Sequence, residues 1–120
     1  MNGIIDEFDA ILIETIEQTL SYVLGEMNSK IIFISLERKS CPKQEIPQKL
    51  EYFCEMLEKI IGGNRGQILG GSSILEFTIA EQLAKKLGKN CTEPKPIAFC
   101  AYVNRLKQEY QVEKRNQKKA

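Results

Sequence analysis

Apolar residues recur at intervals of three or four along most of this 120-residue chain. Such spacing places them on one side of an α-helix, where they can pack into a core. The stretches with this pattern are residues 5–24, 47–61, 74–87 and 96–110. Gly25, Gly62–Gly63 and Gly88 follow three of them directly, and glycine readily takes the left-handed conformation that ends a helix. Together with a further segment discussed below, the pattern predicts an all-α fold, a single compact bundle of about five helices.

The core is expected to form from the periodic positions of these four stretches. They are Ile5, Phe8, Leu12, Ile16, Leu20, Val23, Leu50, Phe53, Cys54, Leu57, Ile60, Ile61, Leu75, Ile79, Leu83, Leu87, Phe99, Tyr102, Val103, Leu106 and Tyr110. Pro47 and Pro96 suit the first turn of a helix, where the missing N–H would be unpaired anyway. From Gln111 onward the chain is too polar to pack, so we expect the last helix to fray there.

Residues 27–39 have two interpretations. Met27, Ile31, Ile34 and Arg38 have helical spacing, which predicts a helix with these residues on its inner side. Residues 31–34, however, form a short β-branched and aromatic run that suits a buried strand equally well. From the residues alone both alternatives stay open.

Charge is distributed unevenly along the chain, although the net charge is only +1. Residues 1–24 carry five acidic and no basic side chains, whereas residues 89–120 carry eight basic and three acidic ones. One interpretation is that the first and last helices lie close together and neutralise each other. The other is an acidic face and a basic tail that recruit a partner or a nucleic acid.

The chain contains few residues suited to catalysis or metal binding. It has no histidine, and no nucleophile lies beside a recognisable base. Its cysteines, Cys41, Cys54, Cys91 and Cys100, lack the paired spacing of zinc and redox motifs. A disulfide between Cys41 and Cys91 is favoured over a four-cysteine metal site, but a reducing cytosol opposes it. We therefore expect no enzymatic activity, no cofactor and no metal.

Two basic or glycine-rich segments are candidates for binding. Residues 63–66, with Asn64 and Arg65 at their centre, resemble the GXXG loop with which KH domains clamp a nucleic-acid backbone. The tail offers cations for phosphates or for an acidic partner. The candidate binding residues are Asn64, Arg65, Lys114, Arg115, Lys118 and Lys119.

The chain shows no sign of a membrane segment. No apolar run approaches the roughly 18 residues that span a bilayer, and the acidic N-terminus does not resemble a secretory signal. We expect a cytoplasmic protein with no membrane partner.

The chain resembles the fifth Nitrosopumilus output domain family, small archaeal domains found alone or beside signalling modules. The residues that carry the resemblance are Val23–Glu26, Leu36–Arg38, Phe53 with Leu57, Ile68–Gly70 and Phe77–Gly88. It covers about residues 5–88; the segment 62–67 and the basic region after Gly88 depart from it. The resemblance implies an all-helical fold, favours a helix at 27–39 and suggests a role in signal transduction. It supplies no catalytic residues.

These observations predict a helical output-like domain at residues 1–88, with a linker and a basic helix at 89–120. We expect a regulatory module that binds a protein and self-associates as a homodimer through an apolar helix face. The alternative is a nucleic-acid-binding regulator that uses the glycine loop and the basic tail.

Overall fold

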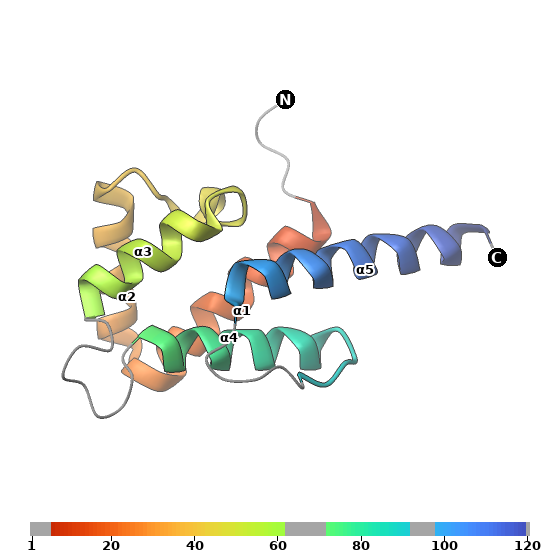
Figure 1. The fold of residues 1–120 in the computed structure, drawn as a ribbon. Coiled ribbons are helices and arrows are strands. Elements are labelled where there is room, and N and C mark those ends of the chain that lie inside the picture. The colour runs from red at the N-terminus through yellow and green to blue at the C-terminus, as the bar shows by residue number, and fades with distance from the viewer. Residues whose placement is uncertain (1–5, 62–71, 92–97, 120) are drawn as a thin grey trace.

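The secondary structure is helical throughout the part of the chain that the computed structural model describes, which is residues 6–61, 72–91 and 98–119. Side chains are described for the same residues except 72, 73 and 116–119. The elements are α1 (Glu7–Leu24), α2 (Glu26–Arg38), the 3₁₀ helix η1 (Lys43–Gln48), α3 (Leu50–Ile61), α4 (Ser72–Lys86) and α5 (Phe99–Lys119). The prediction of an all-α bundle of about five helices is confirmed (Figure 1).

Helix α1 lies at the centre of the bundle, in contact with α2, η1 and α4. Phe8, Leu12, Ile16 and Leu20 are all at most 1% exposed, as their spacing predicted. The helix starts at an N-cap, where the Asp6 carboxylate accepts a hydrogen bond from the Asp9 backbone N–H at 2.9 Å. One expectation for α1 is wrong: Val23 is 44% exposed, because α1 ends one residue later and α2 turns away.

A single glycine joins α1 to α2. Gly25 has φ +92°, and its N–H bonds the Ser21 carbonyl while its own carbonyl accepts from Ser29. Because side-chain-bearing residues are strained at this φ, glycine allows one helix to end and the next to begin without a loop. The following segment is a helix and not a strand, which settles the two interpretations of residues 27–39.

The inner side of α2 differs from the predicted one. Ser29, Ile32 and Leu36 are buried, whereas Met27, Ile31 and Ile34 are at least half exposed. Both sets have helical spacing, so periodicity within α2 could not decide between them. The choice is made by tertiary packing, since Ile32 and Leu36 face α1 and α3.

The expected helix at 47–61 is divided into two. Pro47 lies inside η1, and α3 begins only at Leu50. Lys49, with φ −132°, separates them, and its N–H still bonds the Ile46 carbonyl in the 3₁₀ manner. Ile46 is completely buried, which anchors η1 in the core as a separate short element.

Helix α5 is longer than predicted. The expected fraying from Gln111 onward is wrong, because the helix continues to Lys119 and passes the ends of the other helices (Figure 1). Polar contacts replace apolar packing here: Lys89 lies 2.9 Å from Glu113 and 3.4 Å from Glu109. Lys114 lies 2.7 Å from Glu7. These ion pairs hold the polar half of α5 to the body.

Candidate protein-binding surface

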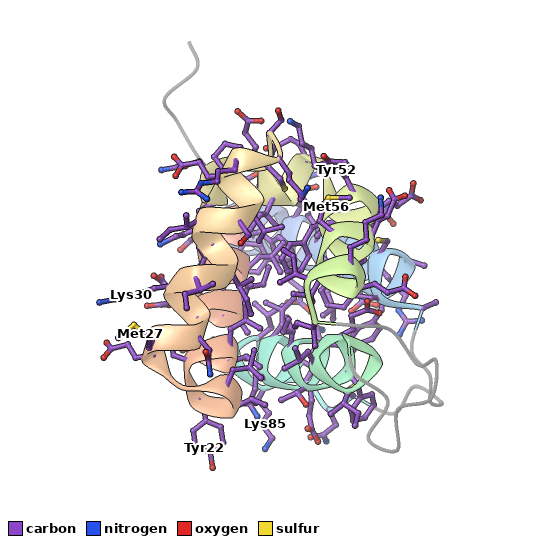
Figure 2. All side chains as sticks on the ribbon, turned by 90° about the vertical axis from the view of Figure 1, so that its left-hand side faces the viewer. Tyr22, Met27, Lys30, Tyr52, Met56 and Lys85 are labelled. Carbon is purple, nitrogen blue, oxygen red and sulfur yellow. The ribbon has the colours of Figure 1, made fainter. Side chains whose placement is uncertain are left out.

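The outer side of α2 carries a row of apolar side chains that nothing in the described chain covers. Met27 is 72% exposed, Ile31 52% and Ile34 50%. Met27 projects away from the neighbouring helices, as does Lys30 beside it (Figure 2). We call Met27, Ile31 and Ile34 the outer α2 face.

The outer α2 face lies opposite the side of α2 that packs into the core. At about 100° per residue, the mean directions of these three residues and of Ser29, Ile32 and Leu36 differ by roughly 180°. A surface helix ordinarily needs one apolar side and presents polar residues on the other. Helix α2 has two apolar sides, and the fold of one chain uses only the inner one.

The last turn of α1 adds two more exposed apolar residues next to the start of α2. Tyr22 is 91% exposed and Val23 is 44% exposed. Tyr22 lines a separate hollow beside Thr78 and Gln82 of α4. The outer α2 face and Val23 together expose roughly 400 Å², within the range of the largest apolar patch on a monomer. An exposed apolar area of this size favours a protein contact over an incidental surface.

A shallow open groove of about 450 Å³ runs beside the outer α2 face, between α2, α1 and η1. Ile34 and Phe33 supply its apolar wall. Opposite them Lys43 bonds Glu17 at 2.8 Å, and its ammonium lies 5.1 Å from the Phe33 ring centroid. One wall of the groove therefore continues the outer α2 face, and the opposite wall carries the charged pair of Lys43 and Glu17.

Lys30 and Glu37 form the charged edge between the outer α2 face and the groove. Both line the groove and both are exposed. Within the described chain neither has an ion-pair partner, in contrast to Lys86 of α4 and to Lys107 and Lys114 of α5. Their charges are free to pair with another molecule.

The basic residues predicted as a binding site lie elsewhere, and Lys114 is already engaged. Its ammonium is 2.7 Å from Glu7 and 5.7 Å from the Tyr110 ring centroid. The hydrogen bond from Lys114 is the main cause that lowers the pKa of Glu7, followed by one from Tyr110. Arg115 lies beside this pair in an open hollow between the start of α1 and α5. Lys114 and Arg115 therefore lie next to the acidic residues at the N-terminal end of α1.

A second lysine of α5 closes the contact with α1. Lys107 lies 3.0 Å from Asp9 and 3.5 Å from Asp6, and Gln48 donates to the other Asp9 oxygen at 3.2 Å. Burial lowers the pKa of Lys107, but the two carboxylates raise it more, and the net shift is upward. Of the two interpretations of the uneven charge, the mutual neutralisation of the first and last helices is the one observed.

The remaining predicted site residues fall where the structure gives no side-chain position. Asn64 and Arg65 lie outside the described residues, together with the GXXG-like segment 63–66. Lys118 and Lys119 lie in the last turn of α5, and their side chains are outside those described. The structure therefore brings together only Lys114 and Arg115 of the six candidates.

All four cysteines are free thiols. Cys41 is fully buried just after α2, whereas Cys54 and Cys100 are half-buried. Burial raises the pKa of Cys54 strongly, which keeps its thiol protonated and unreactive. Among the described side chains no group of three or more His, Cys, Asp or Glu could hold a metal ion.

Sequence reasoning missed the outer α2 face, although a signal was present. Apolar residues within 27–39 follow two helical stripes, one through Met27, Ile31 and Ile34 and one through Ile32 and Leu36. Two opposite stripes on a helix indicate that both sides are in contact with something. The prediction from spacing places the first stripe in the core and gives the second no role.

Comparisons with known proteins give no relative: no family model, no curated protein and no solved structure matches this chain. In the described segments no helix has the length and apolar character required to cross a membrane.

Proposed function

We propose that this protein is a binding module that acts through a protein partner seated on the outer α2 face. The observation that carries the proposal is the second apolar side of α2, with Met27, Ile31 and Ile34 at least half exposed. Covering such side chains is favourable by about 25 cal/mol per Å² of apolar surface, and a protein partner supplies the matching surface.

The proposal includes a role without catalysis, in regulation or signal output. The regulatory context rests on the resemblance to the archaeal output domains, whose small helical members occur beside signalling modules. The character of the surface supports binding, because its three central residues are flexible or branched apolar side chains with charged groups only at the edge. In this role α1, α3 and η1 form a support that holds α2 in place.

Site-specific photo-crosslinking tests this function. A photoreactive amino acid replaces Ile31 in one variant and Ile74 in a control, since Ile74 is an isoleucine of α4 with similar exposure, 46%. We expect irradiation in native extract to yield a discrete protein adduct at position 31 and none at 74. Equal labelling at both positions, or no adduct at 31, contradicts the proposal.

A further inference from the structure

We infer that the partner on the outer α2 face is a second copy of this chain, with the two α2 helices packed antiparallel about a two-fold axis. This inference rests on the proposed function, because it names the partner of the same surface. Three features of α2 support it: the spacing of the apolar residues, the charges along one edge and the uncharged residues along the other.

The spacing of the apolar residues suits two helices that pack side by side with their axes nearly aligned. Met27, Ile31 and Ile34 follow one another by four and then three residues, and Arg38 continues the row. Alternation of four and three is the spacing with which two helices keep one face in mutual contact. If the two-fold axis passes between Ile31 and Ile34, each Ile31 faces Ile34 of the partner subunit. Met27 then faces Arg38 of the partner subunit, whose aliphatic stem can cover it.

The charged edge is complementary to itself only in the antiparallel arrangement. Lys30 and Glu37 are seven residues apart, about 10.5 Å along the axis, on the same side of the row. Reversing the second helix brings Lys30 of one copy beside Glu37 of the partner subunit, and the symmetry makes this pair twice. In a parallel arrangement the charged edge of each copy lies beside the uncharged edge of the other, so the pair between Lys30 and Glu37 does not form. Both residues lack an internal ion-pair partner in the described chain, so dimerisation displaces no existing pair.

The opposite edge of the outer α2 face carries no charges that would repel each other in the antiparallel dimer. Asn28 and Ser35 occupy the equivalent positions on the other side of the row, and both are uncharged. In the same antiparallel arrangement they come beside each other across the interface and can form hydrogen bonds. Neither edge of α2 therefore places like charges in contact.

The available area is sufficient for a specific contact of ordinary size. Val23 and the outer α2 face expose roughly 400 Å² of apolar surface per copy, against about 800 Å² per partner in a standard interface. The charged edge and the adjoining groove can supply the remainder. We expect a reversible dimer and not an obligate one, because obligate interfaces are larger than this.

Sedimentation equilibrium over a range of concentrations tests the self-association. We expect wild-type protein to dimerise and Ile31→Lys to weaken the dimer at least tenfold, because each interface would contain two uncompensated ammonium groups. Ile74→Lys is the matched control and should dimerise like wild type. Circular dichroism checks that both variants keep the helical content of the parent. Equal weakening by both variants, or a wild-type chain that stays monomeric at millimolar concentration, overturns the inference.

Charge reversal tests the direction of packing. Lys30→Glu alone and Glu37→Lys alone should each weaken the dimer several-fold, because each brings like charges together. The double variant Lys30→Glu/Glu37→Lys exchanges the two charges and should recover wild-type affinity. Additive weakening in the double variant overturns the antiparallel arrangement.

The two proposals fail in different ways. A monomeric wild-type chain that still gives a hetero-adduct when crosslinked at position 31 contradicts the homodimer and retains the protein-binding function. A chain that is monomeric and gives no adduct at position 31 contradicts both. An adduct with twice the mass of one chain, seen also with purified protein, supports both.

Discussion

The two ends of α1 differ in whether the side chains around them are in contact with the rest of the chain. At its N-terminal end Asp6, Glu7 and Asp9 meet Lys107 and Lys114 from α5, so charges from the two ends of the sequence pair within one chain. At its C-terminal end Tyr22 and Val23 lead into α2, where the outer α2 face stays uncovered. The first end is closed by intramolecular contacts, and the second is open to another molecule.

This difference indicates where the protein is available for binding. Charged residues are the usual first candidates for recognition, yet Lys107 and Lys114 of α5 are already paired with carboxylates on α1. Apolar residues are the usual candidates for the core, yet three on α2 face outward. Which residues are free depends on tertiary contacts, so the open end of α1 is the better place to look for a partner.

The largest expected effect compares the two sides of α2. Leu36→Ala removes a fully buried side chain and should lower the free energy of unfolding by about 2–5 kcal/mol. Ile34→Ala, two residues away on the outer face, should change it by no more than about 0.5 kcal/mol. Urea unfolding followed by circular dichroism measures both, at a concentration where the chain is monomeric.

The same two variants can also contradict the claim that the outer α2 face is uncovered. If Ile34→Ala proved as destabilising as Leu36→Ala in the monomer, the outer α2 face would be covered within the chain. Its role as a binding surface would then be lost. A large difference that vanishes at high protein concentration would instead show that a second copy covers Ile34.

A smaller difference in stability is expected between variants of two carboxylates at the N-terminal end of α1. Asp9 is only 4% exposed and holds both Lys107 and Gln48, so Asp9→Ala should cost about 1–3 kcal/mol of unfolding free energy. Glu7 is exposed, and its pair with Lys114 is screened by water, so Glu7→Ala should leave stability almost unchanged. Thermal unfolding of the two variants measures the difference. Equal losses would mean that exposure does not control the strength of these ion pairs.

The helices themselves could be predicted from the sequence because the signals are local. The row Phe8, Leu12, Ile16 and Leu20 identified α1, and Gly25 identified its end. Similarly, Gly88 ends α4 with φ +76°, and the Lys89 N–H bonds the Ala84 carbonyl as in a Schellman motif. Such features depend on neighbours within a few residues and not on the fold.

What could not be predicted depends on contacts between distant residues. The division at Lys49 accompanies the burial of Ile46 and the bond between Gln48 and Asp9. The length of α5 follows from ion pairs that join residues more than 20 positions apart. The candidate site was missed for the same reason, since only packing against α1 and α3 decides which side of α2 faces inward.

An RNA-binding experiment tests whether Lys114 is engaged by Glu7 at the N-terminal end of α1. We expect wild-type protein to bind single-stranded RNA only weakly at low salt, and Glu7→Gln to bind more tightly because it frees Lys114. Each cation freed for phosphate should steepen the plot of log affinity against log salt by about 0.7. Lys85→Gln, which removes an exposed cation of α4, is the control. Tight wild-type binding with a steep salt dependence would favour the nucleic-acid alternative over the protein-binding one.

The smallest expected effect is the pH dependence of the Glu7–Lys114 pair. Since the hydrogen bond from Lys114 lowers the folded-state pKa of Glu7 below 4.5, the carboxylate stabilises the folded state above pH 4.5. This contribution should be lost as the pH falls through the lowered value. NMR titration of the Glu7 side chain should therefore show an upward shift of its pKa in Lys114→Met, while the Tyr110 hydroxyl still provides part of the lowering. An unchanged pKa in that variant would mean that Lys114 does not hold Glu7 in solution, and the closed end of α1 would then depend on Lys107 alone.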